Sequence, residues 1–278
     1  MQLNRVTRLP AAFILVTCLT SIAITANPSK LTTIDVPGAI TTEALGINSK
    51  GDIVGHYNTG GSQTHGFLLS KGVYTTIDVP GAILTLASGI NAQGDIVGIY
   101  DDSTFHIHAF LLSNGTFTTI DVPGAIFTDA FGITATGDIV GTYFDGTVHG
   151  FLLSNGVFTK IDSAGSNNVT ARGINSQGDI VGIYADAATG RGFLLSKGVF
   201  TTIDVPGKTM TALGINDEGD IVGQQYDPSA HPYLLSKGVL TTIEIPGGFA
   251  NVTAFGINSK GDIVGSYSGG LHGFLLSK

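Results

Sequence analysis

Two carboxylates stand out because the residues around them are repeated. The tripeptide Gly-Ile-Asn, once Gly-Ile-Thr, recurs along the chain, and the position three residues before it changes from unit to unit. It is Glu43 in the first unit and Asp129 in the third. Two carboxylates that share a pocket can cleave a glycosidic bond if they lie about 5 to 9.5 Å apart. Glu43 and Asp129 are therefore a candidate catalytic pair. The complete series is Glu43, Leu86, Asp129, Thr170, Thr211 and Thr253.

Further acidic residues lie in segments whose sequence varies between units. Arg172 is the only cation near them, and carboxylates supply oxygen acceptors for a cation or a hydroxylated ligand. The alternative is that these residues are solvated loop charges. Calcium is a possible ligand, but no motif supports it, and we expect no cofactor; the sequence leaves a metal site undetermined. The candidate ligand-binding residues are Glu43, Tyr100, Asp101, Asp102, Asp129, Asp145, Arg172, Asp186 and Asp227.

Aromatic and imidazole side chains recur once per unit. The tyrosine series offers either packing or aromatic platforms for sugars, and the histidine series could bind zinc only if its members converge. We expect structural roles for both, with each histidine in a hydrogen bond inside its own unit; His106 and His108 remain a local metal candidate. The two series are Tyr57, Tyr100, Tyr143, Tyr184, Tyr226 and Tyr267, and His65, His108, His149, His231 and His272.

The elements that position these residues follow from the repeat itself. Gly-Asp-Ile-Val-Gly occurs six times, at Gly51, Gly94, Gly137, Gly178, Gly219 and Gly261. The unit of about 42 residues predicts four short strands, at 44–48, 52–57, 65–70 and 73–78 in the first unit. Asn-x-x-Gly turns, two-residue hairpins and Val-Pro-Gly turns connect them. We expect the Asp of each repeat to accept N–H groups of its turn.

The expected fold is an all-β, six-bladed β-propeller of four-stranded antiparallel blades. Apolar residues occur on both faces of the predicted strands, as in blades that are each covered by two neighbours. The chain begins with an unpaired fourth strand at 31–36 and ends after an unpaired third strand at 272–277. Pairing of the N-terminal strand with the C-terminal blade would close the ring. An open solenoid of stacked hairpins is the alternative.

The combination Gly-Ile-Asn-x-x-Gly-Asp-Ile-Val-Gly followed by His-Ala-Phe-Leu-Leu, seen at 89–112, resembles the bacterial extracellular HAF-repeat family. The resemblance covers about 250 residues and implies a secreted or surface propeller-like protein. It implies no catalytic residues. The chain departs from the pattern at 163–165, 191–193 and 231–233, so the fourth and fifth units are expected to be the irregular ones.

The N-terminal 26 residues have the form of a secretory signal peptide. Arg5 and Arg8 precede an apolar stretch, and cleavage after Ala23 or Ala26 is expected, which leaves residues 27–278 as one six-repeat domain without a transmembrane segment. A lipid anchor on Cys18, the only cysteine, is the alternative. Cleavage after Ala26 changes the net charge from −8 to −10, because residues 1–26 contain two arginines and no acid.

The expected function is that of a secreted or surface binding module, located outside the cell or in the periplasm. The acidic charge excludes nucleic acid as a partner, since phosphate binding needs clustered Lys and Arg. Glycans or envelope components are the expected partners, through the acidic variable-loop face, and the protein is expected to be a monomer. One alternative is a hydrolase or lyase that acts on carbohydrate with Glu43 and Asp129. The other is a self-associating surface protein.

Overall fold

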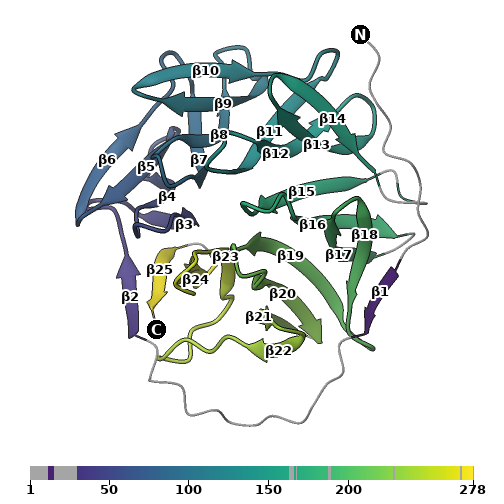
Figure 1. Cartoon of the computed structure of the whole chain (residues 1–278). Coiled ribbons are helices and arrows are strands. Elements are labelled where there is room, and N and C mark those ends of the chain that lie inside the picture. Colours follow the sequence, from purple (N-terminus) through teal and green to yellow (C-terminus); the bar gives the residue numbers. More distant parts are fainter. Residues whose placement is uncertain are drawn as a thin grey trace.

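The computed structural model describes residues 12–15, 30–162, 166, 168–186, 189–227, 229–269 and 271–277, and within them every regular element is a β-strand. The fold is a β-propeller of four-stranded antiparallel blades (Figure 1). The predicted irregularity at 163–165 lies outside the described residues.

Consecutive strands pair with one another in each unit. The strands are β3 (Thr41–Ile47), β4 (Ile53–Asn58), β5 (Thr64–Ser70) and β6 (Val73–Ile77); β7 (Leu84–Ile90), β8 (Ile96–Asp101), β9 (Ile107–Ser113) and β10 (Thr116–Ile120); β11 (Phe127–Ile133), β12 (Ile139–Phe144), β13 (Val148–Ser154) and β14 (Val157–Ile161); β15 (Val169–Ile174), β16 (Ile180–Asp186), β17 (Thr189–Ser196) and β18 (Val199–Asp204); β19 (Thr209–Ile215), β20 (Ile221–Asp227), β21 (Ser229–Ser236) and β22 (Val239–Thr242); and β23 (Thr253–Ile257), β24 (Ile263–Tyr267) and β25 (His272–Ser277). The last three form a sheet with β2 (Lys30–Ile34), which pairs with β25.

Strand pairing groups these strands into five sheets rather than six separate ones. The eight-stranded sheet contains β3–β6 and β7–β10, which are joined only through the parallel pair Thr64–Leu84. The physical reason is that β5 packs face to face on β7 of the next unit, so their first residues come close enough to pair. The five-stranded sheet is β15–β18 with β1 (Ala12–Leu15) added in parallel to the edge of β18. This added strand belongs to the segment for which the sequence predicts a signal peptide.

The N-terminal strand β2 pairs with β25, as the two ends of the repeat predicted. The register runs from Lys30 opposite Ser277 to Ile34 opposite Gly273. Ile34 is buried, and it belongs to the same core cluster as Phe67 of the first unit and Val264 of the last. The first and last units are thus joined both by backbone pairing and by a shared core.

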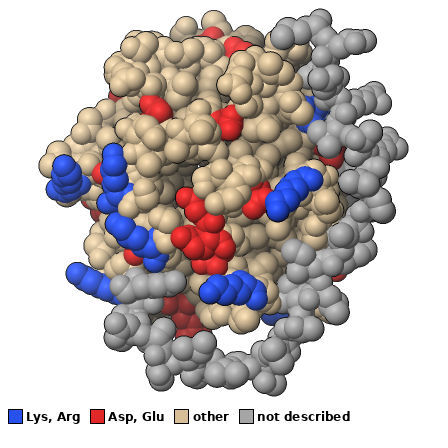
Figure 2. Space-filling view, viewed as in Figure 1, with Lys and Arg blue, Asp and Glu red and all other residues tan. Residues whose placement is uncertain are grey.

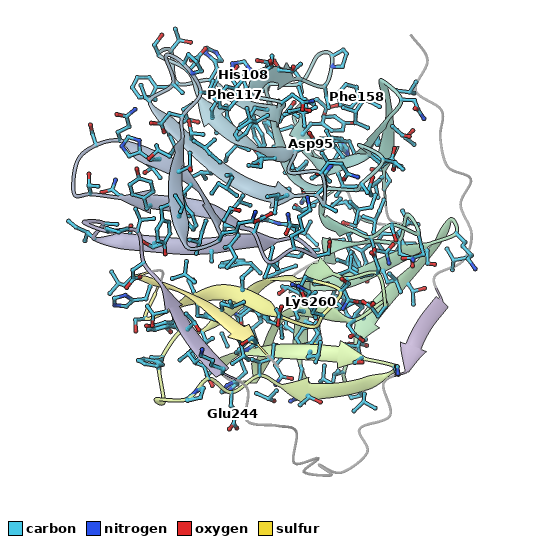
Figure 3. All side chains as sticks on the ribbon, turned by 60° about the vertical axis from the view of Figure 1, so that its left-hand side comes forward. Asp95, His108, Phe117, Phe158, Glu244 and Lys260 are labelled. Carbon is cyan, nitrogen blue, oxygen red and sulfur yellow. The ribbon has the colours of Figure 1, made fainter. Side chains whose placement is uncertain are left out.

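The hydrophobic core lies between neighbouring blades. Val54 of β4, for example, points away from its own core and packs with Ala87 and Phe110 of the following unit. This arrangement explains why both faces of each strand are apolar. Figure 3 shows the labelled Phe117 and Phe158 on β10 and β14, where their rings pack edge-on against Phe110 and Phe151.

The repeated Gly-Asp-Ile-Val-Gly has two structural roles. Its last glycine, Gly55 in the first unit, has no room for a side chain, because a Cβ would lie within 3 Å of both the Glu43 carbonyl and the Phe67 ring. Its first glycine, Gly51, ends the turn at φ 91°, a conformation that glycine tolerates best.

The hydrogen bonds of the Asn-x-x-Gly-Asp turn differ from the prediction. The turn N–H groups of Lys50 and Asp52 donate to the Asn48 side-chain oxygen, not to the aspartate. The Asp52 carboxylate accepts from the Asn48 amide and the Ser70 hydroxyl instead. The Asn48 amide also donates to the backbone carbonyl of Asn91 in the next blade at 3.1 Å. Asparagine has one acceptor and two donors on one side chain, so it can organise its own turn and bind the neighbouring blade at once.

Candidate functional site

The first strands of the units surround the centre of the propeller (Figure 1). Residues of these strands and of the turns that follow them line two cavities there. Each of these strands contacts the next one in the series β3, β7, β11, β15, β19 and β23, and β23 contacts β3. The larger cavity has a volume of about 460 Å³ and the smaller one of about 120 Å³. Isoleucines line both: Ile47, Ile90, Ile133, Ile174, Ile215 and Ile257.

The smaller cavity is lined by the repeated turn residues and the larger one by residues that vary. Asn48 and its equivalents surround the smaller cavity. The larger cavity is lined by Glu43, Leu86 and Asp129 from the variable position identified in the sequence. Thr170, Thr211 and Thr253 occupy that position in the other units but are not part of the lining. The variable side chains thus gather in one cavity, and we define it as the candidate site.

A β-bulge in each first strand brings a second variable residue to the axis. In β15 the register with β16 shifts between Ala171 and Gly173, so that Arg172 is the unpaired residue. In β11 the same shift leaves Phe131 unpaired. Bulges redirect side chains at functional sites. The bulge residues that line the cavity are Leu45, Ser88, Phe131, Arg172, Leu213 and Phe255.

Burial raises the pKa of Asp129, so that this carboxyl group is partly protonated at mildly acidic pH. Its pKa is raised from 3.8 to about 6, mainly by burial; the positive charge of Arg172 opposes this rise and the charge of Asp101 adds to it. Its Oδ1 is buried and has no hydrogen-bond partner among the described residues. A carboxyl group of this kind can accept or donate a hydrogen bond to a ligand at mildly acidic pH.

Arg172 lies against an aromatic ring. Its guanidinium carbon is 4.1 Å from the centre of the Phe131 ring, within the range of a cation–π interaction. Burial lowers the pKa of Arg172, while the Asp129 carboxylate raises it. The Nε atom is buried and has no hydrogen-bond partner in the described part of the chain.

Glu43 and His56 face each other on paired strands. They are directly opposite in the register of β3 and β4, and both line the larger cavity. Burial raises the pKa of Glu43 and lowers that of His56 to about 4, so the imidazole is neutral at physiological pH. The Nδ1 atom of His56 is buried and has no partner among the described residues.

His56 was missed by the sequence reasoning, although a signal was available. It occupies the variable position that follows each Ile-Val-Gly, directly opposite the variable position of the first strand. The six residues at this position are His56, Ile99, Thr142, Ile183, Gln224 and Ser266.

Among the described side chains, Tyr100, Asp101, Asp102 and Asp145 were also predicted to bind the ligand, and they are not among the residues that line the cavity. The Tyr100 ring stacks on His108 with 5.1 Å between ring centres, and its hydroxyl is hydrogen-bonded to Thr119 at 2.9 Å. These contacts favour a packing role over that of an aromatic platform for sugars. Burial and the charge of Asp102 raise the pKa of Asp101, whose charge reaches Asp129. The side chains of Asp186 and Asp227 lie outside the described residues.

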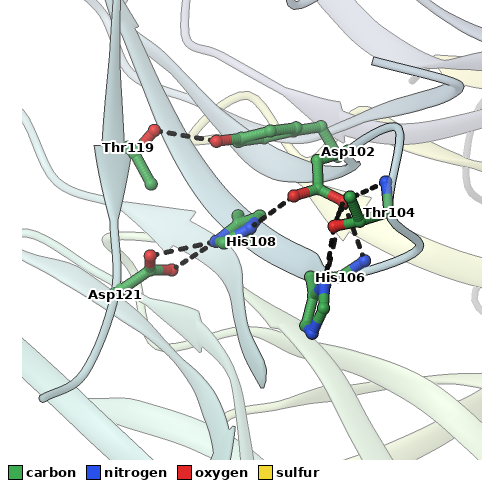
Figure 4. A network of polar contacts seen from close by, with 7 residues as sticks. Asp102, Thr104, His106, His108, Thr119 and Asp121 are labelled. Carbon is green, nitrogen blue, oxygen red and sulfur yellow. Dashed lines mark hydrogen bonds and ion pairs between the residues drawn. The ribbon is translucent and has the colours of Figure 1, made fainter. Parts of the chain in front are cut away.

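Asp102 and Asp145 organise the loops that carry them. Asp102 accepts hydrogen bonds from Thr104 and from the backbone of His106, and it lies 3.6 Å from His108 (Figure 4). These hydrogen bonds lower the pKa of Asp102. Asp145 accepts hydrogen bonds from Thr147 of its own loop, and it lies 3.2 Å from His149 on β13.

The histidine series bonds within the blades, as predicted. His65 contacts Asp78, and His272 contacts Asp35 across the closing strand pair, both at 3.0 Å. Among the described residues no group of three or more His, Cys, Asp or Glu is placed to hold a metal ion, and that includes His106 and His108.

The tyrosine series is interrupted in the fifth unit. Gln225 pairs with Met210 there, at the position that Tyr57 occupies in the first unit. Tyr226 is therefore displaced by one residue, and it is 43% exposed.

Charge is unevenly distributed on the surface. The face in Figure 2 has acidic side chains gathered near its middle and basic side chains spaced around them.

The described part of the chain has no helix long and apolar enough to cross a membrane.

Comparison with known proteins shows the fold alone. No family model matches the chain, and no curated protein matches its sequence. Among solved structures it is similar to a gluconolactonase from Xanthomonas campestris, with a TM-score of 0.55 and 12% identity over 90% of each chain. It is also similar to a catalytically inactive virginiamycin B lyase from Staphylococcus aureus, with a TM-score of 0.52 and 12% identity over 90% of this chain and 99% of that one. TolB from Acinetobacter baumannii matches with a TM-score of 0.56 and 12% identity, over 87% of this chain and 65% of that one. At these identities the chain is shown to share a propeller fold with them.

Proposed function

We propose that the protein is a secreted or surface-exposed, six-bladed propeller of the HAF-repeat kind that binds a hydroxylated ligand, a glycan or an envelope component, in the larger axial cavity. The blade count is supported by the four-stranded ladders within the sheets, by the pairing of β2 with β25 and by the contact of β23 with β3. Secretion is supported by the form of residues 1–26.

One observation carries the binding proposal. His56, Asp129 and Arg172 come from three different units and line the same cavity, and each has a buried polar atom without a hydrogen-bond partner among the described residues. Burying polar atoms without partners costs free energy, and proteins retain such groups where a ligand satisfies them. The smaller cavity is lined mainly by the repeated Ile-Asn residues, whereas acidic, basic and aromatic residues that differ between units line the larger one.

The chemistry of the lining matches a saccharide. Glu43 and Asp129 supply oxygen acceptors for hydroxyl groups, and Phe131 and Phe255 supply flat apolar faces. A few placed polar groups on a largely apolar wall are typical of small-molecule sites, and about 460 Å³ is within their usual size.

The test is a glycan and cell-wall screen with the secreted protein, followed by a blocked variant. Leu86→Trp places a large ring in the lining and is expected to abolish binding. Val73→Trp is the matched control, because Val73 is 64% exposed at the start of an outer strand, away from the cavity. Equal binding by both variants would place the ligand elsewhere.

A second candidate function is hydrolysis or elimination on a carbohydrate. The raised pKa of Asp129, about 6, favours it, because a carboxyl group that is partly protonated near neutral pH can serve as a general acid. Glu43 lines the same cavity and would supply the second carboxylate. Turnover of a bound glycan that disappears in Asp129→Asn, with binding retained, would establish this activity; binding without turnover in the wild type would exclude it for that glycan.

A further inference from the structure

Arg172 is the feature of the cavity that a neutral ligand does not explain. It projects from the bulge of β15, and among the described residues no carboxylate lies within ion-pair distance of its guanidinium. Its guanidinium lies 4.1 Å from the centre of the Phe131 ring, and the nearby Asp129 carboxylate raises its pKa.

A stacked guanidinium leaves its hydrogen-bonding edge free. The aromatic face interacts with the flat side of the group, whereas the N–H donors point outward in the plane. Those donors match the two oxygens of a carboxylate, and such paired, charge-assisted hydrogen bonds are among the strongest in proteins. The geometry therefore provides an anchor for an anion.

The acidic side chains of the cavity limit which anion fits. Asp129 is on β11, the strand next to β15, while Glu43 is on β3, three strands from β15 in the ring of first strands. Both acidic side chains would repel a doubly charged phosphate more strongly than a carboxylate, which carries a single negative charge. Hydroxyl groups on the rest of the ligand would donate to Glu43, across the cavity from the anchor.

We propose that the ligand of this cavity is a sugar acid, whose carboxylate binds Arg172 and whose hydroxyl groups bind Glu43 and Asp129. The inference rests on the proposed saccharide-binding function and narrows its ligand class. A free sugar acid and a uronate residue of a polysaccharide present the same chemistry.

The experiment compares matched sugars by calorimetry on the secreted protein. D-glucuronate is expected to bind at least about tenfold more tightly than D-glucose, the difference that one charge-assisted hydrogen bond supplies, and more tightly than D-glucose 6-phosphate. An oligouronide that binds as well as the monosaccharide would indicate a polysaccharide ligand, and binding of the monosaccharide alone a free sugar acid; both outcomes support the proposal.

Variants assign the preference to Arg172. Arg172→Gln is expected to bind glucuronate and glucose equally, and Arg172→Lys, which keeps the charge without the planar fork, to retain part of the preference. Arg191→Gln is the control, because it removes one positive charge on β17, where Arg191 lies 3.6 Å from Asp204. Melting curves establish that each variant is folded.

The outcomes separate the two proposals. Equal wild-type binding of glucose and glucuronate, or a preference that survives in folded Arg172→Gln, would overturn the sugar-acid inference and leave the saccharide site standing. Absence of binding by every sugar and by the wider glycan screen would overturn both. If Arg172→Gln does not fold, the wild-type comparison of the three sugars and the Arg172→Lys variant still decide the matter.

Discussion

The side-chain amide of Asn258 donates a hydrogen bond to the backbone carbonyl of Asn48 at 3.2 Å, although the two residues are 210 positions apart in the chain. Similar bonds join Asn48 to Asn91, Asn91 to Thr134, Asn175 to Asn216, and Asn216 to Asn258. One residue type at one repeated position thus connects consecutive blades and returns from the last blade to the first.

Thr134 interrupts this series, which leads to a stability prediction. Threonine has no amide to reach the next blade, and its hydroxyl is hydrogen-bonded to Thr136 instead. We expect Thr134→Asn to add the missing bond to the Asn175 carbonyl and to stabilise the protein by about 1 kcal/mol. Chemical denaturation measures the change, with Ala135→Asn, at an exposed neighbouring position, as the control. A lower midpoint for Thr134→Asn than for wild type would contradict the interpretation.

Deletion of residues 31–36 is expected to lower the melting temperature sharply. The deletion removes most of β2, the buried Ile34 side chain and the Asp35–His272 contact, and it leaves the edge of β25 unpaired. Differential scanning calorimetry measures the effect, and Thr32→Ser, at an exposed position of the same strand, is the control. An unchanged melting curve would show that the strand pair does not hold the ring together.

The glycine of Gly-Ile-Asn is expected to be required by the close approach of neighbouring first strands. A Cβ on Gly89 would lie 2.5 Å from the Phe131 carbonyl oxygen, so Gly89→Ala must move one strand and should cost about 1 to 3 kcal/mol. Gly61→Ala is the matched control, because nothing lies within 4 Å of its added Cβ. Similar unfolding midpoints for the two variants would refute this explanation of the repeat.

Asp129 is expected to make folding stability fall as pH rises. Its pKa is about 6 in the folded protein against an ordinary value of 3.8, so the folded state binds the proton more tightly. The stability that this provides is complete below pH 3.8 and is lost as pH rises to about 6, by about 3 kcal/mol at most. His56, whose pKa is lowered to about 4, acts in the opposite direction over the same range, so the wild type alone does not isolate Asp129.

The comparison with Asp129→Asn isolates it. The variant cannot ionise, so we expect the two proteins to be similarly stable at pH 4 and the variant to be the more stable at pH 7.5. The titration of His56 and Glu43 is common to both proteins, whereas the interactions of Asp129 with Arg172 and Asp101 are part of the effect that the difference measures. Urea denaturation at both pH values measures it; equal differences at pH 4 and pH 7.5 would mean that Asp129 ionises normally.

The sequence alone determined the strands, their order and the pairing of the two chain ends, because each of these depends on local patterns or on counting. Turn residues such as Asn48 and Gly51 place strand boundaries through backbone preferences that act within a few residues. Strand β2 could be matched to β25 because β2 is a fourth strand without a preceding third strand, and β25 is a third strand without a following fourth strand.

Only the tertiary structure decided which variable residues meet. Arg172 and Phe131 reach the axis because a bulge turns them inward, and neither a bulge nor its direction follows from the period of the sequence. His56 joins Glu43 because two strands are in register, and Asp102 leaves the candidate set because its own loop satisfies it. Burial then sets the charge of Asp129 and His56, since desolvation depends on every blade around the cavity rather than on the neighbours of a residue in the chain.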